Sequence, residues 1–254
     1  MDEHIETSSA DGIMTIRMNR LDKKNALTSA MYAGLASALD KAFAHKDIRV
    51  VVILGVPGSF SAGNDITDFL QVAMSGKRES MAVFDFLERI IMAPKPVVAG
   101  VDGLAIGIGT TMLLHCDYVV ASDDSLFRTP FVDLGVIPEA GSSLLAPRLI
   151  GHHRAFALLA MGEALSAEDA RQAGFVNRIV PSADIEETAL AVAGDIAAKP
   201  PEAMTITRDL VRGDRTDILA RMREEAELFG ERLKSAEARS AFLAFMNRRD
   251  TAAS

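Results

Sequence analysis

The chain has 254 residues, of which 49% are hydrophobic and 24% charged, and its net charge is −8. This composition fits a globular protein with a sizeable core, and the acidic balance argues against a general nucleic-acid-binding protein. The single cysteine, Cys116, excludes an intramolecular disulfide, and the five histidines show no metal-ligand spacing. Without a signal-peptide core or an apolar run of membrane-spanning length, we expect a cytoplasmic protein without a metal.

Short apolar segments alternate with segments of helical periodicity over most of the chain. This pattern predicts strands at 13–18, 50–54, 97–101 and 117–121, and helices at 28–44, 80–92 and 110–116. Strand-like segments fade after about Val180, and two further helices are predicted at 184–198 and 216–248. We therefore predict an α/β body over residues 1–195, followed by a helical C-terminal region over residues 196–254.

Two glycine-containing loops each connect a predicted strand to a helix, one over residues 60–65 and the other over residues 103–109. The second lacks the third glycine of the dinucleotide fingerprint, and the chain contains no phosphate-binding loop motif. A helix that begins near Ile108 exposes N–H groups, which can bind a developing negative charge. Two such loops could direct two N–H groups at one oxygen. Ordinary strand-to-helix turns are the alternative.

The apolar segment 134–138 runs directly into a carboxylate, Glu139. Gly141 then permits a tight turn, and Ser142 or Ser143 can cap a short helix. Apolar surroundings would raise the pKa of this carboxyl group and a helix N-terminus would lower it, a balance that suits a general base. The alternative is that Glu139 is a surface loop residue that supports the cap.

The order of these motifs resembles the crotonase (enoyl-CoA hydratase/isomerase) family over essentially the whole chain. The matching segments are Asn19-Arg20 with Asn25-Ala26-Leu27, Phe60-Ser61-Ala62-Gly63-Asn64-Asp65-Ile66, Lys95-Pro96-Val97-Val98-Ala99 with Gly103, Gly107-Ile108-Gly109 with Cys116-Asp117, and Pro130 with Leu134-Gly135. The resemblance implies a spiral of ββα units followed by a helical trimerisation region.

Two departures from the family pattern narrow the expected reaction. Hydratases of the family use two glutamates, and this chain has Thr111 and Phe131 at those positions. Neither side chain can act as a carboxylate acid or base. The segment 130–143 instead resembles the peroxisomal-type 3,2-trans-enoyl-CoA isomerases. That resemblance implies that Glu139 is the single catalytic base and that the N–H groups of Asn64 and Ile108 form the oxyanion hole.

The resemblance also implies the substrate and its contacts. We expect an acyl-CoA substrate from fatty acid β-oxidation, no separate cofactor because coenzyme A is part of the substrate, and neither a nucleic-acid nor a membrane partner. The expected substrate-binding residues are Lys24, Ala62, Gly63, Asn64, Asp65, Ile66, Gly107 and Phe131. A hydratase or another crotonase-type reaction, and a non-catalytic acyl-CoA-binding scaffold, are the alternatives.

We expect a homotrimer or a homohexamer, because the predicted C-terminal helices carry more apolar side chains than one chain would need to bury. These side chains are Phe229, Leu233, Phe242, Leu243, Phe245 and Met246. His115, on an apolar helix, is expected to be a hydrogen-bonded core residue, and His152 and His153 to begin a helix; none of the three is expected to be the base.

Overall fold

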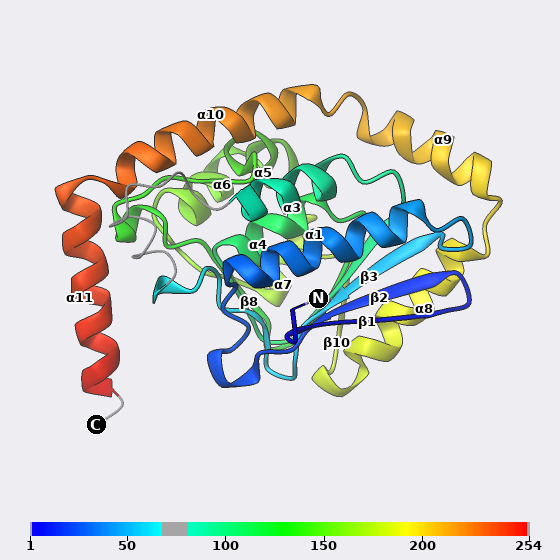
Figure 1. Cartoon of the computed structure of the whole chain (residues 1–254), viewed down its shortest axis with the longest axis horizontal. Coiled ribbons are helices and arrows are strands. Elements are labelled where there is room, and N and C mark those ends of the chain that lie inside the picture. Colours follow the sequence, from blue (N-terminus) through cyan, green and yellow to red (C-terminus); the bar gives the residue numbers. More distant parts are fainter. Residues whose placement is uncertain (1, 68–80, 253–254) are drawn as a thin grey trace.

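A computed structural model describes residues 2–67 and 81–252 of the chain (Figure 1). It contains two β-sheets. The larger sheet has the strand order β1-β2-β3-β5-β7-β10, and the smaller sheet has the order β4-β6-β8-β9. Among the described strands, only β1 and β9 run antiparallel to their neighbours. The strands are β1 (Ile5–Ala10), β2 (Ile13–Met18), β3 (Val50–Leu54), β4 (Ser59–Ser61), β5 (Val97–Val101), β6 (Leu104–Ile106), β7 (Tyr118–Ser122), β8 (Leu126–Arg128), β9 (Leu165–Ser166) and β10 (Arg178–Val180).

The chain repeats one step three times: β3, β5 and β7 lie in the larger sheet, and each is followed by a short strand in the smaller one. The expected spiral of strand pairs and helices is confirmed. The helices are α1 (Ser29–Ala44), α3 (Met81–Ile91), α4 (Ile108–Thr111), α5 (Ser142–Ile150), α6 (His152–Leu159), α7 (Ala167–Gln172), α8 (Ile185–Ala197), α9 (Pro201–Arg212), α10 (Thr216–Leu233) and α11 (Ala236–Ala252). Short 3-10 segments also occur, namely η1 (Leu21–Lys23), η2 (Met112–His115), η3 (Val132–Leu134) and η4 (Ser182–Asp184).

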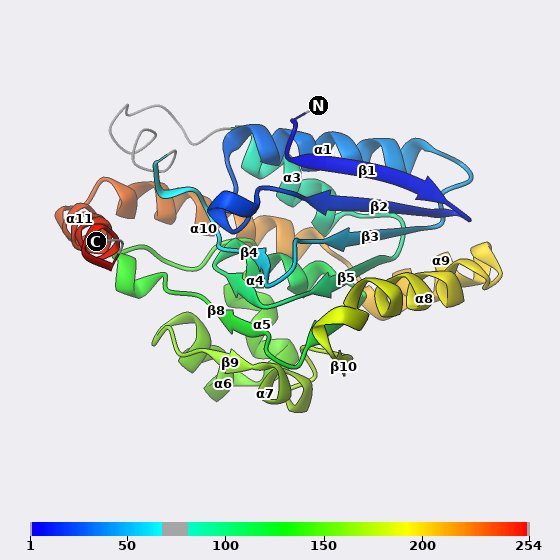
Figure 2. The same cartoon turned by 90° about the horizontal axis from the view of Figure 1, so that it is seen from below.

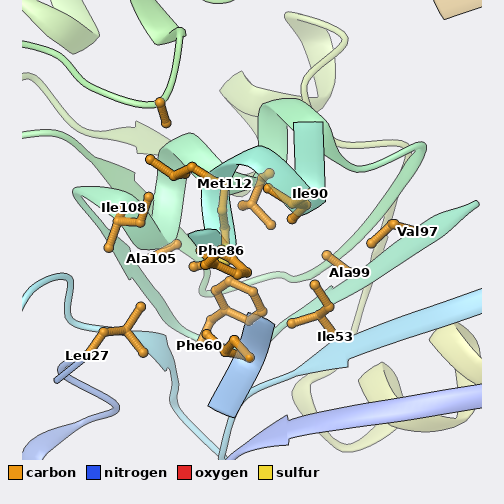
Figure 3. Close-up of a cluster of buried hydrophobic side chains, with 14 of the residues drawn as sticks. Leu27, Ile53, Phe60, Phe86, Ile90, Val97, Ala99, Ala105, Ile108 and Met112 are labelled. Carbon is orange, nitrogen blue, oxygen red and sulfur yellow. The ribbon is translucent and has the colours of Figure 1, made fainter. Parts of the chain in front are cut away.

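Strand β3 is apolar at every position because both faces of the larger sheet are covered. Val51 and Ile53 join the main core, while Val50, Val52 and Leu54 pack with α8 on the other face. The main core fills the space beside α1, α3 and α4, where Phe60 and Phe86 lie together (Figure 3). This central packing fixes the ends of the strands from which the functional loops begin.

The C-terminal helices cover the body rather than forming a separate core. Figure 1 shows α9 and α10 in an arc over the body, and Figure 2 shows α8 and α9 on the side opposite α11. Helix α9 was not predicted, and the single helix predicted at 216–248 is divided between α10 and α11. None of the helices described by the structure combines the length and hydropathy that a membrane span requires.

Part of the apolar surface on which the oligomer prediction rests is buried within the chain. Phe229, Leu233 and Phe242 are each at most 5% exposed, whereas Leu243 is 59% exposed. The side chains of Phe245 and Met246 lie outside the described residues. Burial within one chain means that the first three residues need no partner subunit, so the trimer or hexamer stays a prediction.

Candidate functional site

Two loops meet at the ends of neighbouring strands. Strands β4 and β6 pair in parallel, so their carboxyl ends lie side by side. A Cβ atom added to Gly109 would lie 2.8 Å from the carbonyl oxygen of Ser61, and one added to Gly63 would lie 2.9 Å from that of Ile106. Larger residues at these two glycines would push the loops apart, so the glycines allow the two backbones to touch.

Each loop carries a backbone N–H group for which the described residues provide no acceptor. Leu27 N–H donates to Gly63 O at 2.7 Å, and Asp65 N–H donates to Leu27 O at 2.9 Å. The intervening Asn64 N–H has no acceptor in the described part of the chain, and neither has the N–H of Ile108, the first residue of α4. These are the two N–H groups for which the family resemblance implies a role in an oxyanion hole, and that role stays a prediction.

Side chains hold the first of these loops in place. The Tyr32 hydroxyl, on α1, donates to Asn64 Oδ1. The carboxylate of Asp65 accepts from Arg20 Nη1 at 2.6 Å in a largely buried ion pair. Asp65 therefore stabilises the loop through Arg20, and its predicted contact with substrate remains a prediction.

The other predicted substrate-binding residues differ in their exposure to solvent. Lys24 has an exposed side chain, and its backbone oxygen accepts from Ala62 N–H at 2.9 Å, which places it beside the first loop. Ile66 and Gly107 are half-buried. Phe131 is 6% exposed and belongs to the main core. Their contacts with substrate stay predictions.

Glu139 lies next to the second loop. Thr111 Oγ1 donates to Glu139 Oε1 at 2.5 Å, and the Glu139 residue is half-buried. Thr111 ends α4, three residues after Ile108, which corresponds to about 4.5 Å along the helix axis. One short helix therefore carries both an available N–H group and the hydroxyl that holds the carboxylate. The sequence showed Thr111 only as a missing acid, and its hydrogen bond to Glu139 was not predicted.

His115 fixes the backbone immediately after Glu139. Its Nε2 lies 2.8 Å from Ala140 O, and because a carbonyl only accepts, Nε2 carries the proton. Burial lowers the pKa of His115 to about 4, so the ring is neutral at pH 7. The prediction of a hydrogen-bonded core histidine is confirmed. Burial also raises the pKa of the neighbouring Cys116 thiol to about 12, which makes it a poor nucleophile at neutral pH.

We expect His115 to make stability depend on pH. The folded-state pKa lies below the ordinary value of 6.5, so the unfolded chain binds more protons between about pH 6.5 and 4. Stability should therefore be complete above pH 6.5 and be lost as the pH falls toward 4. From pH 7.5 to 4.5, wild type should lose about 2 kcal/mol more unfolding free energy than His115→Gln, in which the amide can still donate to Ala140. Urea unfolding at both pH values measures this, and equal losses would contradict it.

The predicted cap of the helix after Glu139 is wrong. Neither Ser142 nor Ser143 caps α5, because its N-cap residue is Gly141, which has no side chain to cap the helix. Instead, Glu225 of α10 accepts hydrogen bonds from Gly141 N–H at 2.6 Å and from Ser143 N–H at 3.0 Å. The physical reason is that a carboxylate from another helix can accept from two N–H groups at once.

The remaining histidines add no chemistry to the site. His152 and His153 are exposed at the start of α6, as the sequence predicted for residues that begin a helix. Within residues 2–67 and 81–252, no three histidine, cysteine, aspartate or glutamate side chains are grouped as metal ligands would be. The groups that the structure brings together at this site are the Glu139 carboxylate, the Thr111 hydroxyl and the N–H group of Ile108 on the same short helix.

Comparisons with known proteins show the family to which the chain belongs. The family model described as enoyl-CoA hydratase/isomerase matches residues 8–252. The chain is 35% identical over 251 residues to rat (Rattus norvegicus) enoyl-CoA delta isomerase 2, covering 96% of this chain and 64% of the relative. It is 32% identical to 1,2-epoxyphenylacetyl-CoA isomerase of Escherichia coli strain K12, covering 96% and 97% of the two chains.

A solved structure supports the same assignment. The Pseudomonas aeruginosa protein OdaA has 41% sequence identity and a TM-score of 0.92, with 96% of this chain and 99% of that chain covered. The family model, the relatives and this structure each extend over both the α/β body and the C-terminal helices. The chain therefore belongs to the enoyl-CoA hydratase/isomerase family, the crotonases.

Proposed function

We propose that the chain is a 3,2-trans-enoyl-CoA isomerase that moves the double bond of a 3-enoyl-CoA to the 2-trans position. The observation that carries the proposal is Glu139, a single carboxylate held by Thr111 on the helix that begins with the N–H group of Ile108. The name of the rat relative, enoyl-CoA delta isomerase 2, supports an isomerase that acts on enoyl-CoA. The chain spans 64% of that relative's length, so only the shared part is compared.

The proposed reaction needs one base and one anion-binding site. Glu139 removes a proton from C2 of the substrate, and the electron pair of that C–H bond spreads over a dienolate from the thioester carbonyl to C4. The N–H groups of Asn64 and Ile108 bind the resulting oxyanion. Glu139 then returns its proton to C4, the C3–C4 double bond becomes a C2–C3 double bond, and no atom is gained or lost.

A hydratase would need a second acid–base group at this site. At the two positions where family hydratases have glutamates, Thr111 donates to Glu139 and Phe131 is buried in the core. Neither residue can exchange a proton with an attacking water in place of a carboxylate. These contacts favour isomerisation over hydration.

An isotope experiment tests the proposal. Purified enzyme at catalytic concentration should convert a 3-enoyl-CoA carrying deuterium at C2 into the 2-trans product. Part of the deuterium should appear at C4, because one carboxylate handles both proton transfers. Absence of turnover would favour an acyl-CoA-binding scaffold, and turnover with complete solvent exchange would contradict the return of the abstracted proton by Glu139.

We expect Thr111→Val to slow isomerisation roughly 10- to 100-fold, because a hydrogen bond to a charged group contributes about 1.5–3 kcal/mol. The acidic limb of the pH–rate profile should also move to higher pH, because the lost hydroxyl stabilised the charged carboxylate. Thr111→Ser keeps the hydroxyl and should stay close to wild type. Equal rates and equal pH profiles for the two variants would show that this contact has no role in proton transfer.

A further inference from the structure

Helix α5 begins two residues after Glu139, and a distant side chain closes its first turn. Gly141 at the N-cap has no side chain to donate or accept, and Ser142 Oγ is buried without a partner among the described residues. The carboxylate of Glu225 accepts hydrogen bonds from this turn, at Oε2 from Gly141 N–H and at Oε1 from Ser143 N–H. The start of α5 thus depends on α10.

Three residues on one face of α10 press against this turn. Ile218 packs on Gly141, and Arg221 donates from Nη1 to Ser143 Oγ at 3.1 Å. Glu225 follows four residues after Arg221, so the three side chains share a face of the helix. Glu225 is 3% exposed, and burial raises its pKa, which shows that the fold keeps a carboxylate here against the cost of removing it from water.

Only Ala140 separates Glu139 from the turn that Glu225 holds. Ala140 has φ +62°, a left-handed conformation that is unfavourable for a residue with a Cβ atom. His115 holds its carbonyl oxygen on one side, and Glu225 holds the next N–H group on the other. A backbone restrained at both ends keeps this conformation, and without one restraint Ala140 could return to negative φ and carry Glu139 with it.

We propose that Glu225 is a positioning residue for Glu139, so that α10 sets where the base stands relative to the oxyanion hole. Glu225 acts through the backbone of Gly141 and Ser143, whose N–H groups donate to its carboxylate. The inference rests on the proposed function, since it assumes that Glu139 is the base. It gives the C-terminal helical region an indirect part in proton transfer, through the position of the base.

Glu225→Gln is the sharpest test, because an amide has one accepting oxygen and can replace only one of the two hydrogen bonds. We expect kcat for 3-enoyl-CoA isomerisation to fall roughly tenfold while KM stays within about twofold, because the base is displaced but the binding surface is not. Hydrogen–deuterium exchange of the amides of Gly141 and Ser143 should become faster. Glu227→Gln, an exposed carboxylate on the same helix, is the matched control and should leave all three measurements unchanged.

Faster exchange with an unchanged kcat in Glu225→Gln would overturn the inference, because the turn would then be loosened without moving the base. Glu225→Asp keeps the charge and both oxygens on a shorter side chain, and it serves if the glutamine variant fails to fold. It should show a smaller loss of kcat at unchanged KM, and a wild-type kcat would again overturn the inference. A wild-type enzyme inert toward 3-enoyl-CoA would reject the proposed function instead, and the same comparison would use the acyl-CoA that it does convert.

Discussion

Glu139→Gln is expected to lose at least a hundredfold in isomerase turnover, within the ~10²–10⁴-fold contribution of a general base. The amide oxygen of glutamine can still accept the hydrogen bond from Thr111 Oγ1, so the side chain should keep its place. It cannot accept the C2 proton as a carboxylate does. Steady-state kinetics with a 3-enoyl-CoA measures the loss.

The control for this variant is binding. The affinity for coenzyme A and the thermal stability of Glu139→Gln should be nearly those of wild type, because the proposed oxyanion contacts are backbone groups. A Glu139→Gln enzyme that isomerises at a near-normal rate would exclude Glu139 as the base. A loss of rate accompanied by a loss of binding would place Glu139 in substrate binding rather than in proton transfer.

Asn64→Pro is expected to slow isomerisation about 10²–10³-fold, because proline removes one of the two N–H donors and such a donor contributes about 2.7–4 kcal/mol to the barrier. In the described part of the chain no structural hydrogen bond uses this N–H group, so the substitution removes none. The measurement is kcat for 3-enoyl-CoA, together with a circular dichroism spectrum to check the fold.

Asn64→Ala is the matched control because it keeps the N–H group and removes only the side chain. The Tyr32 hydroxyl loses its Asn64 acceptor, so unfolding free energy should fall by about 1 kcal/mol while turnover changes little. If a folded Asn64→Ala enzyme that still binds coenzyme A were inactive, the side chain would carry the function and the backbone assignment would be wrong.

Long elements of the fold were predictable because each carries a strong local signal. The β-branched run of β3 indicated a strand buried on both faces, and Thr28 accepts from Met31 N–H at the start of α1 as its position predicted. The smaller sheet was not predicted, because β4, β6 and β8 have three residues each, too few to show a period. The break between α10 and α11 at residues 234–235 also lacks a glycine or proline to mark it.

Part of the candidate site could likewise be predicted from the sequence, and part could not. Gly63, Gly109 and Glu139 could be selected from the sequence, because turn chemistry and an unusual carboxylate mark them. The contacts that hold them could not, since they join residues far apart in the chain. Thr111 and Glu139 are separated by 28 positions, and Gly141 and Glu225 by 84.

The role of the buried polar residue Asn25 also could not be predicted from the sequence. Asn25 is completely buried, and its Nδ2 lies within 3.2 Å of the carbonyl oxygens of Met18, Ser59 and Phe60. Asn25 therefore links the first residues of β4 to the last residue of β2. The motif that contains Asn25 was recognised by resemblance alone, and its physical role needs the three-dimensional arrangement of three separate segments.

The rates of two reactions on one sample of wild-type enzyme test the central claim that a single carboxylate drives isomerisation. The measurement is kcat/KM for isomerisation of a 3-enoyl-CoA and for hydration of the 2-enoyl-CoA of the same chain length. We predict rapid isomerisation with slow or undetectable hydration, because Thr111 and Phe131 provide no second acid or base. Hydration much faster than isomerisation would contradict the single-carboxylate mechanism.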